Sequence, residues 1–138
     1  MRRIALVLGL TFAVGIAVGV IGYQVLNAQQ VQVKRTELIK TDLAGIPGRE
    51  GIVWITEIPT GAGSGKHYHP GHNFLYVLEG SVTTVEEGKP PVTYKAGDAF
   101  HELPMNVHEG KNASTTGTVK VLVFQAAEKG KPLTVPVK

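Results

Sequence analysis

Residues 65–73 read Gly-Lys-His-Tyr-His-Pro-Gly-His-Asn, and they contain three of the five histidines of the chain. This stretch belongs to a single window that holds all the histidines of the chain: His67, His69, His72, His101 and His108. His67 and His69 are two positions apart, so on a β-strand their side chains leave the same face. Two imidazoles aimed at one point form half of a metal site. The alternative is a surface histidine pair in a turn beside Pro70 and Gly71.

Length and composition limit the remaining possibilities. The 138 residues suffice for one domain, and the absence of cysteine excludes disulfides, thiol catalysis and cysteine metal sites. Without Arg2 and Arg3, twelve Lys and Arg face eleven Asp and Glu, so the remaining chain is nearly neutral. No basic cluster is interleaved with aromatic residues, and we therefore expect no nucleic-acid partner.

The N-terminal segment has the pattern of an export signal. Arg2 and Arg3 precede residues 4–22, which are uncharged and almost entirely apolar. This run is longer than the roughly 7–15 residues of a cleaved signal and close to the ~20 needed to span a bilayer. Residues 1–28 are therefore either a signal peptide, cleaved after Ala28, or a membrane anchor. In both cases residues 29–138 would form the folded domain in the periplasm or outside the cell, touching a membrane only through the N-terminal segment.

The rest of the chain has the pattern of short β-strands. Apolar, β-branched and aromatic runs recur roughly every 8–12 residues between Gly, Pro and Asp. We expect strands at residues 35–39, 51–58, 74–78, 81–85, 92–94, 99–103 and 119–125. Glu79 and Gly80 read as a tight hairpin turn, and residues 110–117 as a polar connection. The tail from Glu128 could cover a sheet edge or pair with a partner chain. Because no helical period appears, the predicted fold is a small all-β antiparallel sandwich or barrel.

Two segments resemble the two sequence motifs of the cupins. In the first, His67 and His69 are followed by three spacers, then Asn73 where a Glu is usual, then six residues and Gly80. The second has Gly97-Asp98, Pro104, His108 and, after three residues, Asn112. The resemblance implies a small single-domain cupin, a jelly-roll-like antiparallel β-barrel of six to eight strands. It also implies, together with exposed strand edges, a homodimer.

The resemblance further implies that His67, His69 and His108 bind a divalent transition metal at the barrel mouth. Fe, Zn, Ni, Cu and Mn all remain candidates. Asn73 could be a fourth ligand, although it offers only a neutral oxygen and could instead position a water. Three imidazoles and an amide would leave the whole charge of the metal unbalanced. This charge favours an anionic ligand or substrate and weakens the case for Mn²⁺.

Other polar residues compete for roles near the metal. Glu102 and His101 are consecutive on a predicted strand, so only one can face the interior. We predict that Glu102 faces inward and acts as a general base. We place His72 in a solvent-exposed turn, although it could replace the missing Glu ligand. Large aromatic residues such as Trp54 are more often core residues of a small β domain than pocket residues.

Three functions are compatible with these features. The first is a metal-dependent enzyme, for which the resemblance allows dioxygenase, decarboxylase or isomerase chemistry on a small organic molecule that could be anionic. The second is a non-catalytic module that binds a metal or a small molecule. The third is a structural cupin with an empty site.

Overall fold

The computed structural model of the protein describes residues 32–137. The predicted signal or anchor at residues 1–28, with its expected hydrophobic helix, lies outside the described residues. Residues 32–137 contain ten strands and no helix, so the all-β prediction is confirmed for this part of the chain. It follows that no helix within this range could cross a membrane.

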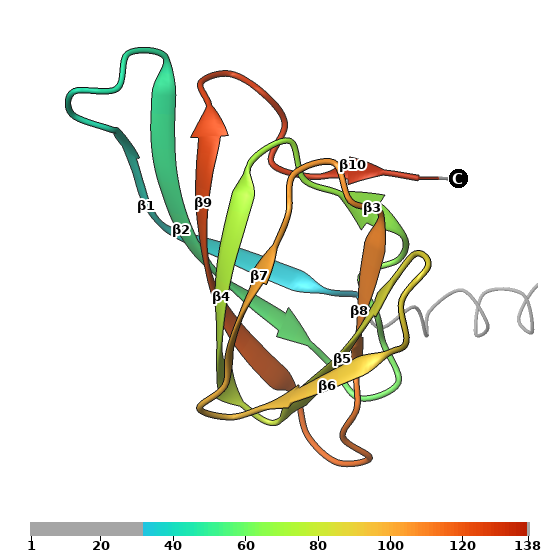
Figure 1. The fold of residues 1–138 in the computed structure, drawn as a ribbon. Helices are drawn as coiled ribbons and strands as arrows, with labels where there is room; N and C mark the ends of the chain where they lie inside the picture. The colour runs from blue at the N-terminus through green and yellow to red at the C-terminus, as the bar shows by residue number, and fades with distance from the viewer. Residues whose placement is uncertain (1–31, 138) are drawn as a thin grey trace, which may run out of the picture. The chain divides into compact units, whose positions relative to one another are not determined.

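The ten strands form two antiparallel sheets of five that face each other (Figure 1). The first sheet has, in spatial order, β1 (Lys34–Asp42), β2 (Arg49–Ile58), β9 (Val119–Glu128), β4 (His72–Glu79) and β7 (Ala99–Glu102). The second has β10 (Val135–Pro136), β3 (His67–Tyr68), β8 (His108–Asn112), β5 (Ser81–Glu86) and β6 (Val92–Lys95).

The alternation of side chains along the first sheet separates a core face from an outer face. In β4, Leu75 and Val77 point inward, whereas Phe74 and Tyr76 point outward and are 50% and 45% exposed. The core consists mostly of β-branched residues, which pack well on a pleated surface. Its buried members are Ile52, Trp54, Ile58, Leu75, Val77, Val82, Val119, Val121, Val123 and Ala127. Tyr76 is therefore not a core residue, whereas Trp54 is.

Most predicted strands are present, but three details of the prediction were wrong. Glu79 and Gly80 do not form a hairpin, because β4 and β5 belong to different sheets. Gly80 instead sits at a corner with φ of 74°, a left-handed conformation that glycine adopts without strain. The expected polar connection starts later than predicted, since β8 continues to Asn112. The structure has ten strands, more than the predicted six to eight, because the two-residue strands β3 and β10 were not predicted as separate strands.

The C-terminal tail pairs within its own chain. Val135 lies opposite Tyr68 and Pro136 opposite His67, so β10 covers the free edge of β3. The turn between β3 and β4 is held close to β9, where a Cβ on Gly71 would collide with the backbone oxygen of Ala126. These two contacts fix both ends of the histidine-rich segment that carries the site.

Candidate metal centre

Three buried histidines meet between the sheets. His67 is on β3 and His108 lies directly opposite it on β8, while His69 follows β3 by one residue. All three side chains are no more than 5% exposed. Their ring centroids are 4.5 to 5.2 Å apart, and one ring nitrogen of each lies within 4.8 Å of the others. The structure thus brings together the three histidines that the sequence predicted as ligands.

The outer nitrogen of each ring is held by a backbone carbonyl. Nδ1 of His67 lies 2.8 Å from the oxygen of Gly65, and Nδ1 of His108 lies 2.9 Å from that of Asn106. Nδ1 of His69 lies 2.6 Å from the oxygen of Leu133, in the C-terminal tail. Because a carbonyl can only accept, each Nδ1 carries the proton and each neutral ring turns the lone pair of Nε2 inward. Metal-binding histidines are commonly oriented in this way.

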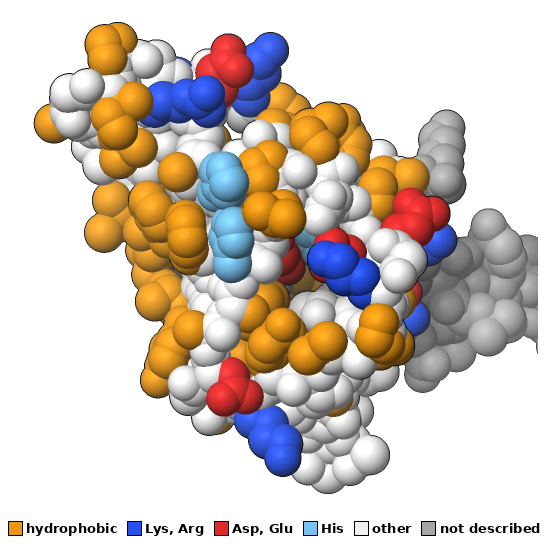
Figure 2. All heavy atoms as spheres, viewed as in Figure 1, with side chains coloured by type: hydrophobic (Ala, Val, Ile, Leu, Met, Phe, Trp, Pro, Cys, Tyr) orange, Lys and Arg blue, Asp and Glu red, His pale blue; other side chains and the backbone are white. Residues whose placement is uncertain are grey.

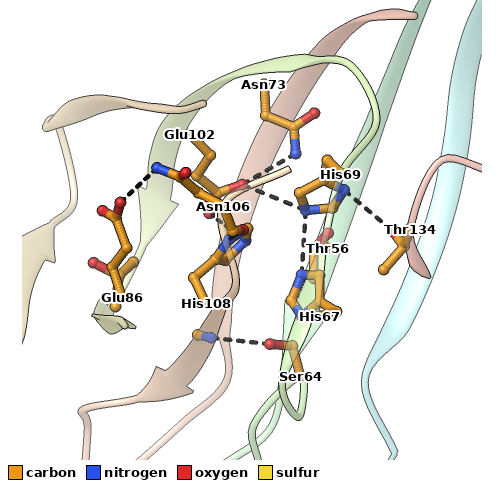
Figure 3. A network of polar contacts seen from close by, with 12 residues as sticks. Thr56, Ser64, His67, His69, Asn73, Glu86, Glu102, Asn106, His108 and Thr134 are labelled. Carbon is orange, nitrogen blue, oxygen red and sulfur yellow. Dashed lines mark hydrogen bonds and ion pairs between the residues drawn. The ribbon is translucent and has the colours of Figure 1, made fainter. Parts of the chain in front are cut away.

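Glu102 adds a carboxylate to this group of nitrogens (Figure 3). Its Oε1 lies 3.3 Å from Nε2 of His108, and its Oε2 lies 3.5 Å from Nε2 of His69. Its side chain is 14% exposed, so the prediction that Glu102 faces inward is confirmed. Nε2 of His67 and Nε2 of His69 are 3.2 Å apart. Lone pairs and carboxylate oxygens therefore face one another, an arrangement that requires a proton or a cation between them.

Asn73 holds the carboxylate in place. Asn73 on β4 lies opposite Glu102 on β7, and its Nδ2 donates a hydrogen bond of 3.0 Å to Oε2 of Glu102. The reverse orientation of the amide would set two oxygens against each other. Oδ1 of Asn73 is consequently turned away from Glu102, and it is buried without a hydrogen-bond partner among the described residues. The Asn that replaces the usual Glu of the motif thus stands beside a Glu on the neighbouring strand.

The pKa values reflect this arrangement. Burial lowers the pKa of His69 to about 4, and it also lowers the pKa of His67. Burial opposes a charge on His108 as well, but the hydrogen bond and charge of Glu102 outweigh it and raise the pKa of His108. Burial raises the pKa of Glu102, yet the hydrogen bond and charge of His108, together with His69 and Asn73, outweigh burial and the net pKa lies below the ordinary value. Without a cation, a proton on His108 balances Glu102 while His67 and His69 stay neutral.

The donor set fits a transition metal. Two ligand atoms about 2.1 Å from a tetrahedral metal are roughly 3.4 Å apart. The contact between Nε2 of His67 and Nε2 of His69 is 3.2 Å, and the two contacts of Glu102 are 3.3 and 3.5 Å. Imidazole nitrogens with one carboxylate suit Fe, Zn, Ni, Cu or Mn, so the chemistry of the donors leaves the identity of the metal open.

Comparison with known protein families identifies the fold. A family model described as "Cupin domain" matches residues 54–124, which is more than half of the chain. The chain belongs to the cupin family. The matched range contains both halves of the site, from the histidines near β3 to His108 on β8. A search of curated proteins finds no match.

Solved structures show the same cupin fold. A conserved protein with a double-stranded β-helix domain from Klebsiella pneumoniae is 19% identical, with a TM-score of 0.61 over 80% of this chain and 89% of its own. The DMSP lyase DddQ from Ruegeria pomeroyi is 18% identical, with a TM-score of 0.63 over 80% of this chain and 54% of its own. A cupin-like protein from Thermotoga maritima is 26% identical, with a TM-score of 0.56 over 72% of this chain and 77% of its own.

The other two histidines of this cupin lie on the outer face of the first sheet. His72 and His101 are exposed, and their rings stack with Nδ1 of His72 at 3.0 Å from Nε2 of His101. Histidine side chains are visible at the surface in Figure 2, with hydrophobic side chains beside them. The structure therefore separates this pair from the buried cluster, as the predicted exposure of His72 requires.

A cavity opens beside the three buried histidines, and Trp54 and Glu102 line it. Its lining also includes Arg35 and Thr56, which the sequence analysis missed. Trp54 is thus both a core residue and part of the cavity wall. Arg35 lies opposite Thr56 in the pairing of β1 with β2. Strand alternation could have suggested an inward Arg35, but only the register shows which face of β1 meets the cavity.

Proposed function

We propose that this cupin is a metal-dependent enzyme that acts outside the cytoplasm on a small organic molecule. The observation that supports the proposal is the convergence of three Nε2 atoms on one carboxylate, with the outer nitrogen of each ring held by a backbone carbonyl. The fixed outer nitrogens mean that the ligand orientation exists before any metal arrives, which lowers the cost of binding. Dioxygenase, decarboxylase and isomerase reactions are the classes to test, and the structural neighbour described as a DMSP lyase adds lyase chemistry.

Within this proposal, Glu102 is the carboxylate ligand and Asn73 its positioning residue. The distances of 3.3 and 3.5 Å from Glu102 to Nε2 of His108 and Nε2 of His69 support its inclusion in the donor set. A general base would need a free lone pair directed at the substrate, whereas both carboxylate oxygens of Glu102 face histidines. The negative charge expected at position 73 is supplied from the neighbouring strand.

The residues of the chain would then perform distinct tasks. A bound divalent cation supplies Lewis-acid polarisation of an oxygen atom on the substrate or of a water molecule. His67 and His69 stay neutral because burial lowers their pKa values, and Glu102 would offset part of the cationic charge. Apolar side chains of the cavity, including Leu75, Phe100 and Val123, exclude water and so strengthen the electrostatic interactions within it.

A non-catalytic binding module is the second candidate, and one observation favours it. The titratable residues that line the cavity, in the part of the chain that the structure describes, are Arg35, His67, His69, Glu102 and His108. If the histidines and Glu102 all bind the metal, this lining contains no free general base. A reaction at the site would have to proceed without one, whereas binding needs none.

The exchange of two cross-strand partners tests the assignment of Glu102. Glu102→Gln should lower metal affinity about 10- to 100-fold, measured by competition with a chromogenic chelator. The double variant Asn73→Glu with Glu102→Asn moves the carboxylate across to the other strand and should recover most of the affinity. If Glu102→Gln keeps its metal but loses turnover, Glu102 is the general base instead.

Metal analysis followed by activity assays tests the function itself. Protein purified without chelator or affinity tag should contain a stoichiometric transition metal, identified by mass spectrometry. Oxygen uptake and product analysis with each candidate metal, across small acids, diols and thioethers, should then reveal turnover that His67→Ala abolishes. Ligand binding without turnover under any metal would support the binding module, and absence of metal after reconstitution would contradict the enzyme and the metal-binding form of the module.

The location outside the cytoplasm needs its own test. It is supported by the apolar run at residues 4–22. A fusion to a reporter enzyme that is active only in the periplasm should be active with residues 1–28 present and inactive without them. Mass spectrometry of the N-terminus of the exported protein separates cleavage after Ala28 from retention as an anchor.

A further inference from the structure

We propose that Arg35 binds the carboxylate of the substrate, so that the site selects small carboxylic acids. The inference rests on the proposed function in treating the cavity beside the histidines as the substrate site. It adds the chemical class of the substrate and a residue that determines specificity.

The pairing of β1 with β2 directs Arg35 into the cavity. Arg35 lies opposite Thr56, and Thr56 lines the cavity together with Trp54. Residues directly opposite each other on antiparallel strands project from the same face of the sheet. A register shift between Glu37 and Ile39 then breaks the alternation of β1. Arg35 lies before this shift, so it keeps the register that sets it on the cavity side of the edge strand β1.

The guanidinium group of Arg35 is held in place by two neighbours. Its Cζ lies 5.9 Å from the centroid of the Trp54 ring, and its Nη1 donates a hydrogen bond of 2.7 Å to Oγ1 of Thr134. Trp54 is itself fixed, because its Nε1 donates to Oγ1 of Thr56 at 3.0 Å. The cation is thus oriented by a cation–π contact and one hydrogen bond, which leaves most of its five N–H donors for a ligand.

The charge of Arg35 lacks a counterion within the described range. Among residues 32–137, no carboxylate lies within 4.0 Å of the guanidinium; the same holds for Arg49, whereas six lysines of this range form ion pairs with Asp or Glu. Arg35 is exposed to solvent at the edge strand, yet partial burial lowers its pKa, and the charge of Glu102 only partly opposes this effect. A carboxylate from outside the chain would supply the missing partner, and the planar fork of arginine suits it well.

The rest of the cavity limits what can accompany that carboxylate. The space open to the centres of water-sized molecules is about 50 Å³, a few times the ~10–15 Å³ that one water needs. Besides Trp54, the apolar part of the lining consists of Ile58, Leu75, Val82, Phe100, Val121 and Val123. A short aliphatic acid fits these limits, with its carboxylate at Arg35 and its body against the apolar wall.

Fluorescence of Trp54 provides a direct test, because Trp54 is the single tryptophan of the chain and lies beneath Arg35. The full-length protein is titrated with propionate and with propionamide, which has nearly the same shape but no charge, in the Zn²⁺-loaded and the metal-free form. Propionate should give a saturable change in emission, and propionamide should give none in the same concentration range.

Three variants localise the effect. Arg35→Gln should weaken propionate binding about tenfold or more, since it removes charge-assisted hydrogen bonds. Arg35→Lys should lose less, because it keeps the charge but not the fork. Arg49→Gln is the matched control: it makes the same change on β2, at a position that does not line this cavity, and should bind propionate like the wild type. Thermal unfolding confirms that each variant is folded.

Two results would overturn the assignment. One is an equal response to propionamide and propionate. The other is a propionate response that survives in Arg35→Gln but vanishes on metal removal, which would place the anion on the metal. The metal-free titration separates this proposal from the proposed function. An Arg35-dependent response in a protein that binds no metal would refute the metal-dependent enzyme and support the anion site. Metal-dependent turnover without an Arg35-dependent response would support the enzyme and refute the anion site.

Discussion

Two groups of histidines in this protein make similar nitrogen contacts in very different surroundings. His67 and His69 approach each other to 3.2 Å, and His72 and His101 to 3.0 Å. The first two are buried, their outer nitrogens are held by carbonyls, and Glu102 lies beside His69. The second pair is exposed, and within residues 32–137 no hydrogen bond holds its remaining ring nitrogens. Proximity of imidazoles therefore does not define a metal site; fixed tautomers, burial and a nearby negative charge do.

Removal of single imidazoles should have the largest effect. We expect His67→Ala and His108→Ala each to reduce the metal content of purified protein to background, because each removes one of three fixed nitrogens. His72→Ala and His101→Ala serve as controls and should retain a stoichiometric metal. Metal loss in either control, or its retention in His67→Ala, would contradict the distinction between the two groups.

Removal of the C-terminal tail should have the next largest effect on metal affinity, because the tail holds His69 of the buried group. A stop codon after Lys131 deletes the carbonyl of Leu133, which holds Nδ1 of His69, and the strand β10, which pairs with β3. Loss of such outer partners typically lowers metal affinity about 10- to 100-fold, which isothermal calorimetry would measure. A chain that lacks only Lys138 is the control and should bind like the wild type.

Acidification should weaken metal binding through His108. Because Glu102 raises the pKa of His108, the metal must displace a proton below that pKa, and affinity should fall about tenfold per pH unit. The dependence should steepen as pH approaches the pKa of His69, which is about 4. Calorimetry in buffers of different ionisation enthalpy counts the released protons.

The same pKa shifts predict the stability of the metal-free protein. A raised pKa means that protonated His108 stabilises the fold below its ordinary pKa, and that this stabilisation disappears as pH rises through the raised value. Glu102→Gln removes the main group that raises the pKa of His108. In a plot of metal affinity against pH, the pH below which affinity begins to fall should therefore be lower in this variant than in the wild type. The profile should be unchanged in His72→Ala, since the exposed pair takes no part in it.

The smallest expected effect concerns Thr134, which contacts both Arg35 and His69. Its Oγ1 accepts from Arg35 at 2.7 Å and lies 3.3 Å from Nδ1 of His69. Thr134→Val should lower metal affinity only about two- to fivefold, because His69 keeps the carbonyl of Leu133. The control Thr60→Val removes a hydrogen bond of equal length to Gly117, which does not line the cavity. A larger effect of Thr134→Val would mean that the hydroxyl, not the carbonyl, orients His69.

The parts of the site that follow from local periodicity could be predicted from the sequence. His67 and His69 share a face because strand side chains repeat every two residues, and His108 follows from the spacing of the second motif. The same alternation showed that only one of His101 and Glu102 could face inward, but it did not determine which. The predicted homodimer and the location outside the cytoplasm remain predictions.

The parts that depend on strand register could not be predicted. Asn73 contacts Glu102 because β4 pairs with β7 at that position, and no local pattern specifies this partner. Arg35 reaches the cavity only through the register of β1 against Thr56. The error at Gly80 has a related cause, since a glycine with positive φ suits a hairpin and a change of sheet equally well.

The position of β10 also sets the time at which the site can be completed. A ribosome synthesises Leu133 after every residue of the donor set, so the carbonyl that orients His69 does not yet exist when the ligands emerge. The edge of β3 likewise stays open until Val135 and Pro136 have been added. Capture of a metal at full affinity would therefore have to follow the synthesis of Leu133 and β10. The site is completed by residues that are made later than all of its ligands.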